Sequence, residues 1–308
     1  MCTLEKRGNL FILTLTGEDD HRLGLPLIST LRATLDQIRT EAKPGSVLIT
    51  TAHGKFFSNG FDLAYAADKN GSINIPRLRE MVDGFKPVIS DFLTLPLPTI
   101  AVVSGHAAAA GFMLALVHDY VLMRKDRGVL YMSEINIGLT FPDYFMALMK
   151  SKITSPIARR DVVLRAAKLT AEKAVEYGII DSAHQNLEET MKAGLKLGEE
   201  LGSKKWKGEI YADIRMNSYS EISELLGLVE NFKSTDVLIW RPSVLSPARK
   251  SNAMQKFLKK KRLANNLETN AYGRQDPTSN HFWGIGRRLL LEQLRDLYFF
   301  IMQKHESF

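Results

Sequence analysis

The sequence predicts an α/β fold in which strand–strand–helix units repeat along the chain as successive turns of a spiral. Short apolar runs at residues 47–51 and 100–103 are typical of buried strands. The second run leads, through a turn rich in alanine and glycine, into apolar residues 112–117 that favour a buried helix. Two further short strands are expected at residues 120–124 and 128–132, on either side of a polar turn.

The elements before this region follow the same alternation. A strand is expected at residues 9–16, followed by an amphipathic helix over residues 26–43 that begins with a proline and ends at a Pro-Gly pair. A polar, glycine-containing loop at residues 68–74 then precedes a helix over residues 75–93.

The second half of the chain is predicted to be mostly helical, with one short strand at residues 179–181. Thr170 is suited to cap the helix expected at residues 171–177, and Gly178 is suited to end it. An amphipathic pattern also appears at residues 289–302. The main helices are expected at residues 157–167, 171–177, 187–201 and 210–232.

Basic charge is concentrated at one end of the chain. The 308 residues carry 41 Lys and Arg against 34 Asp and Glu, a formal net charge of +7. Residues 237–308 hold 13 basic and 5 acidic side chains, a net charge of +8, so residues 1–236 carry −1. The near-neutral body has no charge footprint for nucleic acid, while the basic end contains the cluster Lys259–Arg262.

The overall composition is typical of a soluble globular enzyme, with 45% apolar residues. The only cysteine, Cys2, lies at an N-terminus expected to be flexible, which excludes a disulfide framework. The histidines lack the spacing of metal ligands, so no metal site is predicted. No apolar stretch is long enough to cross a bilayer.

Residues 99–120, TIAVVSGHAAAAGFMLALVHDY, join a predicted strand to a helix N-terminus through residues with almost no side chain. Small residues let a ligand approach the backbone, and the free N–H groups of a first helical turn can hold a developing oxyanion. The alternative is an alanine-rich helix packed tightly in a core. A second stretch, Lys55–Leu63, follows the predicted strand at residues 47–51.

Together these two stretches resemble the crotonase (enoyl-CoA hydratase/isomerase) superfamily. Its first signature is a strand followed by K-x-F-x-x-G-x-D-L, and the second, about forty residues later, is P-x-I-A-x-x-x-G-x-A-x-x-G. Here the second runs from Pro98 to Gly111. Within the superfamily the chain is most similar to the plant peroxisomal Δ3,Δ2-enoyl-CoA isomerases, through segments such as KFFSNGFDLA and HDYVLMRKDRGVLYMSE. The resemblance covers roughly residues 1–230.

The resemblance implies an α/β crotonase spiral of repeated β-β-α units, followed by a C-terminal helical region. It implies a spiral core at residues 1–195 and a helical region at residues 196–236 that packs across subunits in a homotrimer. Residues 237–308 form a basic extension outside the resemblance, which we expect to be poorly ordered.

The resemblance also implies an oxyanion hole for a thioester enolate, built from the backbone N–H groups of Phe61 and Ala110. The loop residues Ser58, Asn59 and Gly60 are expected to shape the site for the coenzyme A ester. Asp62 and Lys55 complete the predicted substrate-binding set. Asp62 is suited to cap the following helix, and Lys55 is either close to the coenzyme A phosphates or a solvated surface lysine.

The predicted base is Glu134. Moving a double bond from C3 to C2 requires removing a proton from C2 and delivering one at C4, which a single carboxylate can do. Hydration in the superfamily uses two glutamates, and the first of these positions here is Met113, which cannot exchange protons. One carboxylate therefore favours isomerisation. Asp143, where another branch of isomerases places its glutamate, is the rival base.

These features predict an acyl-CoA double-bond isomerase of fatty acid β-oxidation that needs no metal or redox cofactor. The alternatives are other enolate chemistry on a coenzyme A ester, such as hydration or processing of an auxin-precursor side chain, and a non-catalytic subunit that binds such esters. Family resemblance indicates a peroxisomal location. The final residues, His305–Phe308, are not a Ser-Lys-Leu address, so the cytosol is the alternative.

Overall fold

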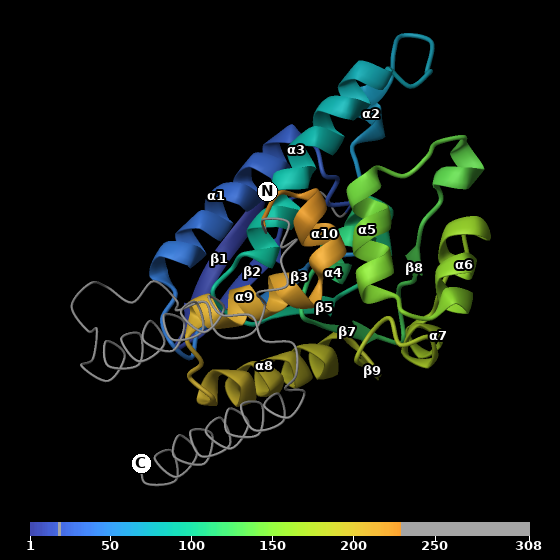
Figure 1. The fold of residues 1–308 in the computed structure, drawn as a ribbon. Helices are drawn as coiled ribbons and strands as arrows, with labels where there is room; N and C mark the ends of the chain where they lie inside the picture. Colours follow the sequence, from blue (N-terminus) through green and yellow to red (C-terminus); the bar gives the residue numbers. More distant parts are fainter. Residues whose placement is uncertain (18–19, 229–308) are drawn as a thin grey trace, which may run out of the picture. The chain divides into compact units, whose positions relative to one another are not determined.

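The computed structural model describes residues 1–17 and 20–228, which hold the predicted core and most of the predicted helical region. Its main sheet has six strands in the order β1-β2-β3-β5-β7-β9 (Figure 1). Only the β1–β2 pair is antiparallel. The strands are β1 (Cys2–Arg7), β2 (Leu10–Leu15), β3 (Val47–Ala52), β5 (Thr99–Val103), β7 (Tyr120–Arg124) and β9 (Ser182–His184).

A second, three-stranded parallel sheet runs in the order β4-β6-β8. Its strands follow β3, β5 and β7 in the chain, so each turn of the spiral contributes one strand to each sheet. This alternation confirms the predicted fold class. The three strands are β4 (Phe56–Ser58), β6 (His106–Ala108) and β8 (Leu130–Tyr131).

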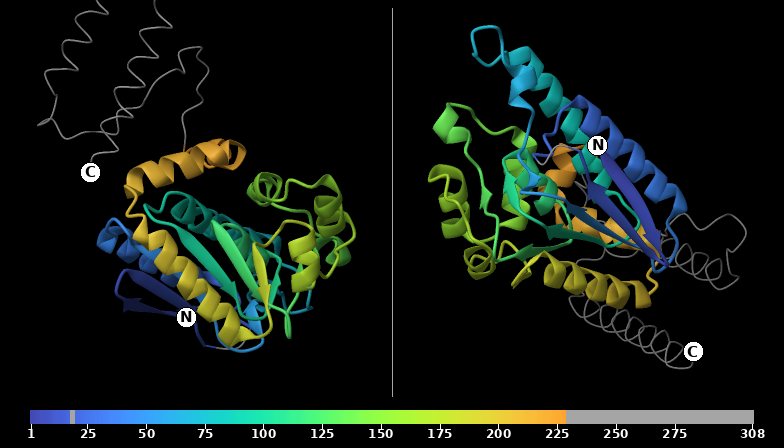
Figure 2. Two further views of the ribbon diagram at one scale, coloured as in Figure 1. Left: turned by 90° about the horizontal axis from the view of Figure 1, so that it is seen from below. Right: turned by 180° about the vertical axis from the view of Figure 1, so that it is seen from behind.

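Helices cover both faces of the main sheet. Helices α1 and α3 lie side by side on one face, over the large buried core, and α8 (Leu187–Ser203) crosses the other face (Figure 1, Figure 2). A Cβ atom added at Gly194 would lie 2.7 Å from Val102 Cγ2, so a glycine lets α8 approach β5 closely. The first four helices are α1 (Leu25–Glu41), α2 (Leu63–Ala66), α3 (Ile75–Leu93) and α4 (Ala110–Leu116).

The remaining helices are the 3-10 helix η1 (Glu134–Ile137), α5 (Asp143–Lys152), α6 (Pro156–Leu164), α7 (Ala171–Glu176), α8 (Leu187–Ser203), α9 (Gly208–Ser218) and α10 (Ser220–Leu225). Three of them, α6, α7 and α8, agree well with those predicted at residues 157–167, 171–177 and 187–201, whereas η1 and α5 are not predicted. Thr170 caps α7 as expected, because its Oγ1 accepts a hydrogen bond from Lys173 N at 3.3 Å.

Four predicted features differ from the structure. The N-terminus is not flexible, because Cys2 begins β1 and its Sγ lies 3.6 Å from Thr34 Oγ1. The helix expected from residue 210 onward is broken at Tyr219, which separates α9 from α10 with φ −116° and ψ 52°. The short strand expected at residues 179–181 lies at 182–184, and β8 is shorter than expected.

The basic extension at residues 237–308, with its Lys259–Arg262 cluster and the pattern at residues 289–302, lies outside the described residues. So does the end of the helix predicted up to residue 232. Within residues 1–17 and 20–228, no helix combines the length and the hydrophobicity required to span a membrane.

Candidate active site

The two sequence signatures meet at the carboxyl ends of the three-stranded sheet. Strand β4 leads into the Asn59–Asp62 loop, β6 into Ala109 and Ala110, and β8 into Ser133 and Glu134. Because the three strands are parallel neighbours, their carboxyl ends lie at the same edge. Ligand sites of parallel sheets form at this edge.

Glycines bring the two signature loops into backbone contact. A Cβ atom added at Gly111 would lie only 2.3 Å from Ser58 O, and one added at Gly60 would lie 3.0 Å from Ala108 O and 3.5 Å from Ala110 N. Gly60 also has φ +75°, which favours glycine. The glycines that carry the signatures are therefore required where the loops touch.

The backbone N–H groups of Phe61 and Ala110 donate to no acceptor among the residues that the structure describes. Ala110 is the first residue of α4, where an N–H group has no partner within its own helix. The neighbouring Ala109 N–H is used, because it donates to Tyr131 O at 2.9 Å. The two predicted oxyanion donors are thus free and lie on loops that touch.

Ala109 has a strained backbone. Its φ of 50° and ψ of −122° fall in a region that residues with a Cβ atom rarely adopt. Strain of this kind costs roughly 1–3 kcal/mol and is found at functional sites. It sets the direction of the chain just before the free Ala110 N–H.

A cavity of about 490 Å³ opens over these loops. Both loops contribute to its wall, through Asn59, Phe61, Ala108 and Ala109, and Glu134 lines the same space. Arg22 and Tyr131 add polar groups to the wall beside Asn59. The cavity therefore joins both signatures and the predicted base in one site.

Glu134 is the buried carboxylate of this cavity. It begins η1, is 8% exposed, and its Oε2 has no hydrogen-bond partner among the described residues. Burial raises the pKa of the Glu134 carboxyl, an effect that the backbone amides of Glu134 and Ser133 partly offset. A buried carboxylate oxygen without a protein partner is available to a substrate, as a general base requires.

Asp143, the rival base, is placed differently. It is exposed, does not line the cavity, and begins α5 with its Oδ1 accepting a hydrogen bond from Tyr144 N at 2.7 Å. Met113, at the position of a second family glutamate, is fully buried in the core and is not part of the cavity wall.

The predicted substrate-binding loop is held by hydrogen bonds on its outer side. Asn59 Nδ2 donates to Asp20 Oδ2 at 3.1 Å, and Ser58 Oγ donates to His21 O at 2.8 Å. Asp62 caps α2 as expected, accepting from Ala64 N and Tyr65 N. Of Ser58, Asn59 and Asp62, only Asn59 lines the cavity, so Ser58 and Asp62 position the loop.

Lys55 lies at the opposite end of β4 and does not reach the cavity. Its side chain is exposed, with Nζ 5.5 Å from the centre of the Phe56 ring. Its carbonyl oxygen would lie 2.1 Å from a Cβ atom at Gly105, so its backbone is closely packed. The geometry favours a solvated surface lysine, and a contact of Lys55 with coenzyme A remains a prediction.

Sequence reasoning missed the apolar wall of the cavity. Helix α3 contributes Leu78 and Val82, and the start of α5 contributes Phe145. The Phe145 ring stacks on that of Phe61, with centroids 6.1 Å apart, and Phe85 meets Phe61 edge-on at 5.7 Å. The 3.6-residue periodicity of α3 was a visible signal, but it does not distinguish a face in a core from one in a cavity.

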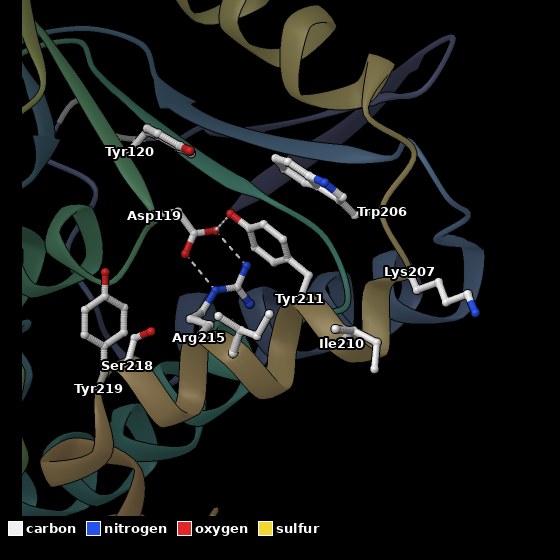
Figure 3. Close-up of a pocket in the computed structure, with 10 residues that line it drawn as sticks. Asp119, Tyr120, Trp206, Lys207, Ile210, Tyr211, Arg215, Ser218 and Tyr219 are labelled. Carbon is white, nitrogen blue, oxygen red and sulfur yellow. Dashed lines mark hydrogen bonds and ion pairs between the residues drawn. The ribbon is translucent and has the colours of Figure 1, made fainter. Parts of the chain in front are cut away.

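A second cavity of about 590 Å³ lies against α9, away from the signature loops. Its charged floor is the Asp119–Arg215 ion pair, with Arg215 Nη2 2.6 Å and Nε 2.7 Å from the two carboxylate oxygens (Figure 3). Burial alone would raise the pKa of Asp119, but the Arg215 guanidinium outweighs it and the pKa is lowered. Asp119 is thus a buried structural carboxylate.

The buried histidine that follows α4, His118, is also structural. His118 Nδ1 lies 2.9 Å from Leu114 O, and its Nε2 lies 2.8 Å from Thr50 Oγ1. Burial lowers the pKa of His118 to about 4, so the ring is neutral at physiological pH. Chemistry in the described residues therefore centres on the cavity that contains Glu134.

A spiral of paired strands, with two free amides and a buried carboxylate at one sheet edge, defines a protein of the crotonase class. The sequence model of the enoyl-CoA hydratase/isomerase family matches residues 18–233. The chain therefore belongs to the enoyl-CoA hydratase/isomerase family.

Several relatives from Arabidopsis thaliana match most of the chain. It is 55% identical to enoyl-CoA delta isomerase 3 over 236 residues, which cover 76% of this chain and 99% of that protein. It is 56% identical to the peroxisomal enoyl-CoA delta isomerase 2 over 232 residues, covering 74% and 96% of the two chains. The peroxisomal enoyl-CoA delta isomerase 1 is 50% identical over 224 residues, covering 72% and 91%.

Solved structures share the fold. The apo structure of an enoyl-CoA isomerase from Mycobacterium tuberculosis superposes with a TM-score of 0.65 at 20% identity, over 73% of this chain and 94% of that one. An enoyl-CoA hydratase from Mycobacterium ulcerans gives a TM-score of 0.65 at 20% identity and the same coverage.

Proposed function

We propose that this chain is an enoyl-CoA delta isomerase of fatty acid oxidation, which converts 3-enoyl-CoA into trans-2-enoyl-CoA. The observation that carries the proposal is the single buried carboxylate, Glu134, in a cavity whose wall includes Phe61 and Ala109. The free backbone amides belong to Phe61 and to Ala110, the residue after Ala109. The names of the Arabidopsis relatives support the same activity.

The thioester oxygen is bound between Phe61 N–H and Ala110 N–H. Removing a proton from C2 places negative charge on this oxygen, and fixed N–H donors stabilise that charge more strongly than they stabilise the neutral carbonyl. Because both donors are backbone groups held by touching loops, they need no reorganisation during the reaction.

Glu134 carries the proton. In its ionised form it removes a proton from C2, the electrons of the C–H bond and of the C3=C4 bond delocalise into a dienolate, and the same carboxyl group returns the proton to C4. The double bond then lies between C2 and C3, and no atom is gained or lost. A raised pKa makes the carboxylate a stronger base in the first step and keeps the carboxyl group able to donate its proton in the second step.

Hydration needs a second acid–base group to position and activate water. Met113 occupies that position with a buried thioether outside the cavity wall. The arrangement therefore supports isomerisation over hydration.

The remaining features of the proposal come from the family and from the names of relatives. The substrate is an acyl-CoA thioester, and turnover needs no metal or redox cofactor. We place the enzyme in the peroxisome because two relatives are named peroxisomal. We also infer a homotrimer, in which the exposed apolar side chains of α9, Ile210 and Ile214, meet a neighbouring subunit. Light scattering of the purified protein measures the assembly.

The experiment that tests the function measures two reactions of the purified full-length protein, isomerisation and hydration. A 3-enoyl-CoA should be converted to 2-enoyl-CoA, while a 2-enoyl-CoA offered as substrate should be hydrated much more slowly. Hydration faster than isomerisation would identify a hydratase with an unrecognised second acid. Binding of the ester without turnover would identify a non-catalytic subunit.

A further inference from the structure

Two exposed isoleucines line the cavity that contains Glu134. Ile75, at the start of α3, is 50% exposed, and Ile137, at the end of η1, is 48% exposed. Large exposed apolar side chains at the rim of a cavity are typical of a surface that an apolar ligand covers.

Ile137 is aligned with the predicted base by the geometry of its helix. Glu134 and Ile137 are the first and last residues of a four-residue 3-10 helix. In a 3-10 helix the side chains at i and i+3 eclipse each other, because there are three residues per turn. Ile137 therefore extends the wall that begins at the carboxylate, whereas Ile135, with 52% exposure, does not line the cavity.

Ile75 begins an apolar stripe on α3 that runs from the rim to the interior. Ile75, Leu78, Val82 and Phe85 follow one another at helical spacing, and exposure falls from 50% at Ile75 to zero at Phe85. The first three line the cavity, and Phe85 packs edge-on against the rings of Phe61 and Phe145. This aromatic cluster closes the inner end of the stripe.

The cavity wall also carries polar groups. On α3 the exposed residues Arg79 and Asp83, next to Leu78 and Val82 in the sequence, line the cavity. Arg22, Asn59 and Tyr131 come from the loops and strand on the side of β4 and β8, and they suit the polar part of a coenzyme A ester. The apolar stripe of α3 and the isoleucine of η1 remain for the hydrocarbon. Because the aromatic cluster blocks the interior, a long hydrocarbon must leave the cavity over the two isoleucines.

We propose that Ile75 and Ile137 form an outer acyl subsite, which binds the distal methylene groups of long acyl chains and makes the enzyme favour long-chain over short-chain 3-enoyl-CoA. The inference rests on the proposed function, in that the ligand is taken to be an acyl-CoA. A short acyl chain is held by Phe61, Leu78 and Val82 and does not reach the rim, so the subsite affects long chains alone.

The test compares two substrates, 3-hexenoyl-CoA and 3-dodecenoyl-CoA, on wild type and two variants. Ile75→Ser and Ile137→Ser should each lower kcat/KM for the dodecenoyl substrate by about tenfold, as expected for loss of an apolar contact in a pocket. The loss should appear in KM, with kcat nearly unchanged, because the contacts are the same in the ground and transition states. Activity on the hexenoyl substrate should change less than about twofold.

The matched control is Ile135→Ser, which removes an equally exposed isoleucine from the same 3-10 helix but outside the cavity. It should leave the ratio of the two kcat/KM values unchanged. A fall of that ratio in Ile135→Ser as large as in Ile137→Ser would overturn the subsite, because the effect would then not require the cavity wall. Equal losses on both substrates in the Ile75 and Ile137 variants would overturn it too.

A binding measurement separates the subsite from the activity. Saturated hexanoyl-CoA and dodecanoyl-CoA cannot react, and calorimetry gives their dissociation constants with each variant. Weaker binding of dodecanoyl-CoA alone in the Ile75 and Ile137 variants supports the subsite even if wild type turns over no 3-enoyl-CoA, which would refute only the proposed function. Unchanged dodecanoyl-CoA binding in both variants would refute the subsite while leaving isomerase activity to its own assay.

Discussion

Ala109 is the residue where the site departs most from ordinary backbone geometry. It holds a positive φ with a Cβ atom that lies in the cavity wall, directly before the free Ala110 N–H. A position of this kind favours glycine, so a glycine substitution would relieve the strain energy of the backbone.

Replacing Ala109 with glycine should therefore stabilise the protein. We expect Ala109→Gly to raise the free energy of unfolding by roughly 1 kcal/mol, since relief of strain exceeds the entropy cost of a glycine. Urea denaturation measures the change. Ala108→Gly, one residue earlier in β6, should instead destabilise the protein, and stabilisation by both variants would contradict the strain at Ala109.

The Ala110 donor can be removed without touching the rest of the helix. Ala110 is the first residue of α4, a position where proline is well tolerated. Ala110→Pro deletes the N–H group, and we expect kcat/KM to fall by about 10²–10³-fold, as for loss of one oxyanion donor. A side-chain change would be less informative, because the Ala110 methyl group is buried in the core.

The control for the proline is Ala171→Pro at the first position of α7, far from the signature loops in the sequence. It should keep full activity. Circular dichroism and thermal unfolding establish that both variants fold. A folded Ala110→Pro enzyme with the kcat/KM of wild type would show that the thioester oxygen does not bind this amide.

At the scale of elements, Arg215 attaches α9 to the rest of the fold. Its side chain is 2% exposed and pairs with Asp119, and its Nη1 and Nη2 donate to the carbonyl oxygens of Leu95 at 2.7 Å and Leu97 at 2.6 Å. These carbonyls belong to the segment between α3 and β5, and Asp119 directly precedes β7, so one side chain links α9 to the starts of β5 and β7.

Breaking this link should be costly. Arg215→Met leaves the buried Asp119 carboxylate without its partner, and we expect the free energy of unfolding to fall by about 3–5 kcal/mol. Thermal or denaturant unfolding measures it. Lys150→Met, which breaks an exposed ion pair with Glu221, should cost less than about 1 kcal/mol. Similar losses in the two variants would contradict the role of Arg215.

The elements that the sequence predicts best are those with strong local signals. Strands β3 and β5 are apolar runs, α3 has clear 3.6-residue periodicity, and Asp62 and Thr170 are good helix caps that precede their helices. The two signatures and Glu134 lie on three consecutive turns of the spiral, and their spacing predicts the candidate site.

The features that escape prediction depend on contacts between distant parts of the chain. Strand β1 carries mostly exposed side chains and is defined by backbone pairing with β2, which no periodicity reveals. The positive φ of Ala109 is hidden because alanine does not signal it. The face of α3 that lines the cavity differs from a core face only once α5 and η1 are placed opposite it.

At the scale of the whole molecule, ionisation of the buried Glu134 carboxyl group makes the free energy of unfolding depend on pH. Because burial raises the pKa of Glu134, the folded protein keeps this proton at pH values where the unfolded chain, with an ordinary value of about 4.3, has lost it. The folded state then binds more protons than the unfolded state, so this group makes the free energy of unfolding fall as pH rises through that window.

The Glu134→Gln variant has no ionisable group at this position, so its free energy of unfolding should lack this dependence on pH. We expect the melting temperature of Glu134→Gln to rise relative to that of wild type as the pH increases above about 4. The kcat/KM of wild type should rise over the same range, with its midpoint above that of an ordinary glutamate, because the base must be ionised. Parallel stability profiles for the two proteins would show that Glu134 has no raised pKa.

The most direct test of the central claim, that Glu134 is the base that moves the proton, is the steady-state isomerisation of a 3-enoyl-CoA by wild type, Glu134→Gln and Asp143→Asn. The account predicts that kcat of Glu134→Gln falls by about 10²–10⁴-fold with little change in binding of the ester, since the variant keeps the shape of the side chain but not its basicity. Asp143→Asn should stay close to wild type, because Asp143 is exposed and outside the cavity. Near-full activity of Glu134→Gln together with a large loss in Asp143→Asn would contradict the account and move the base to α5.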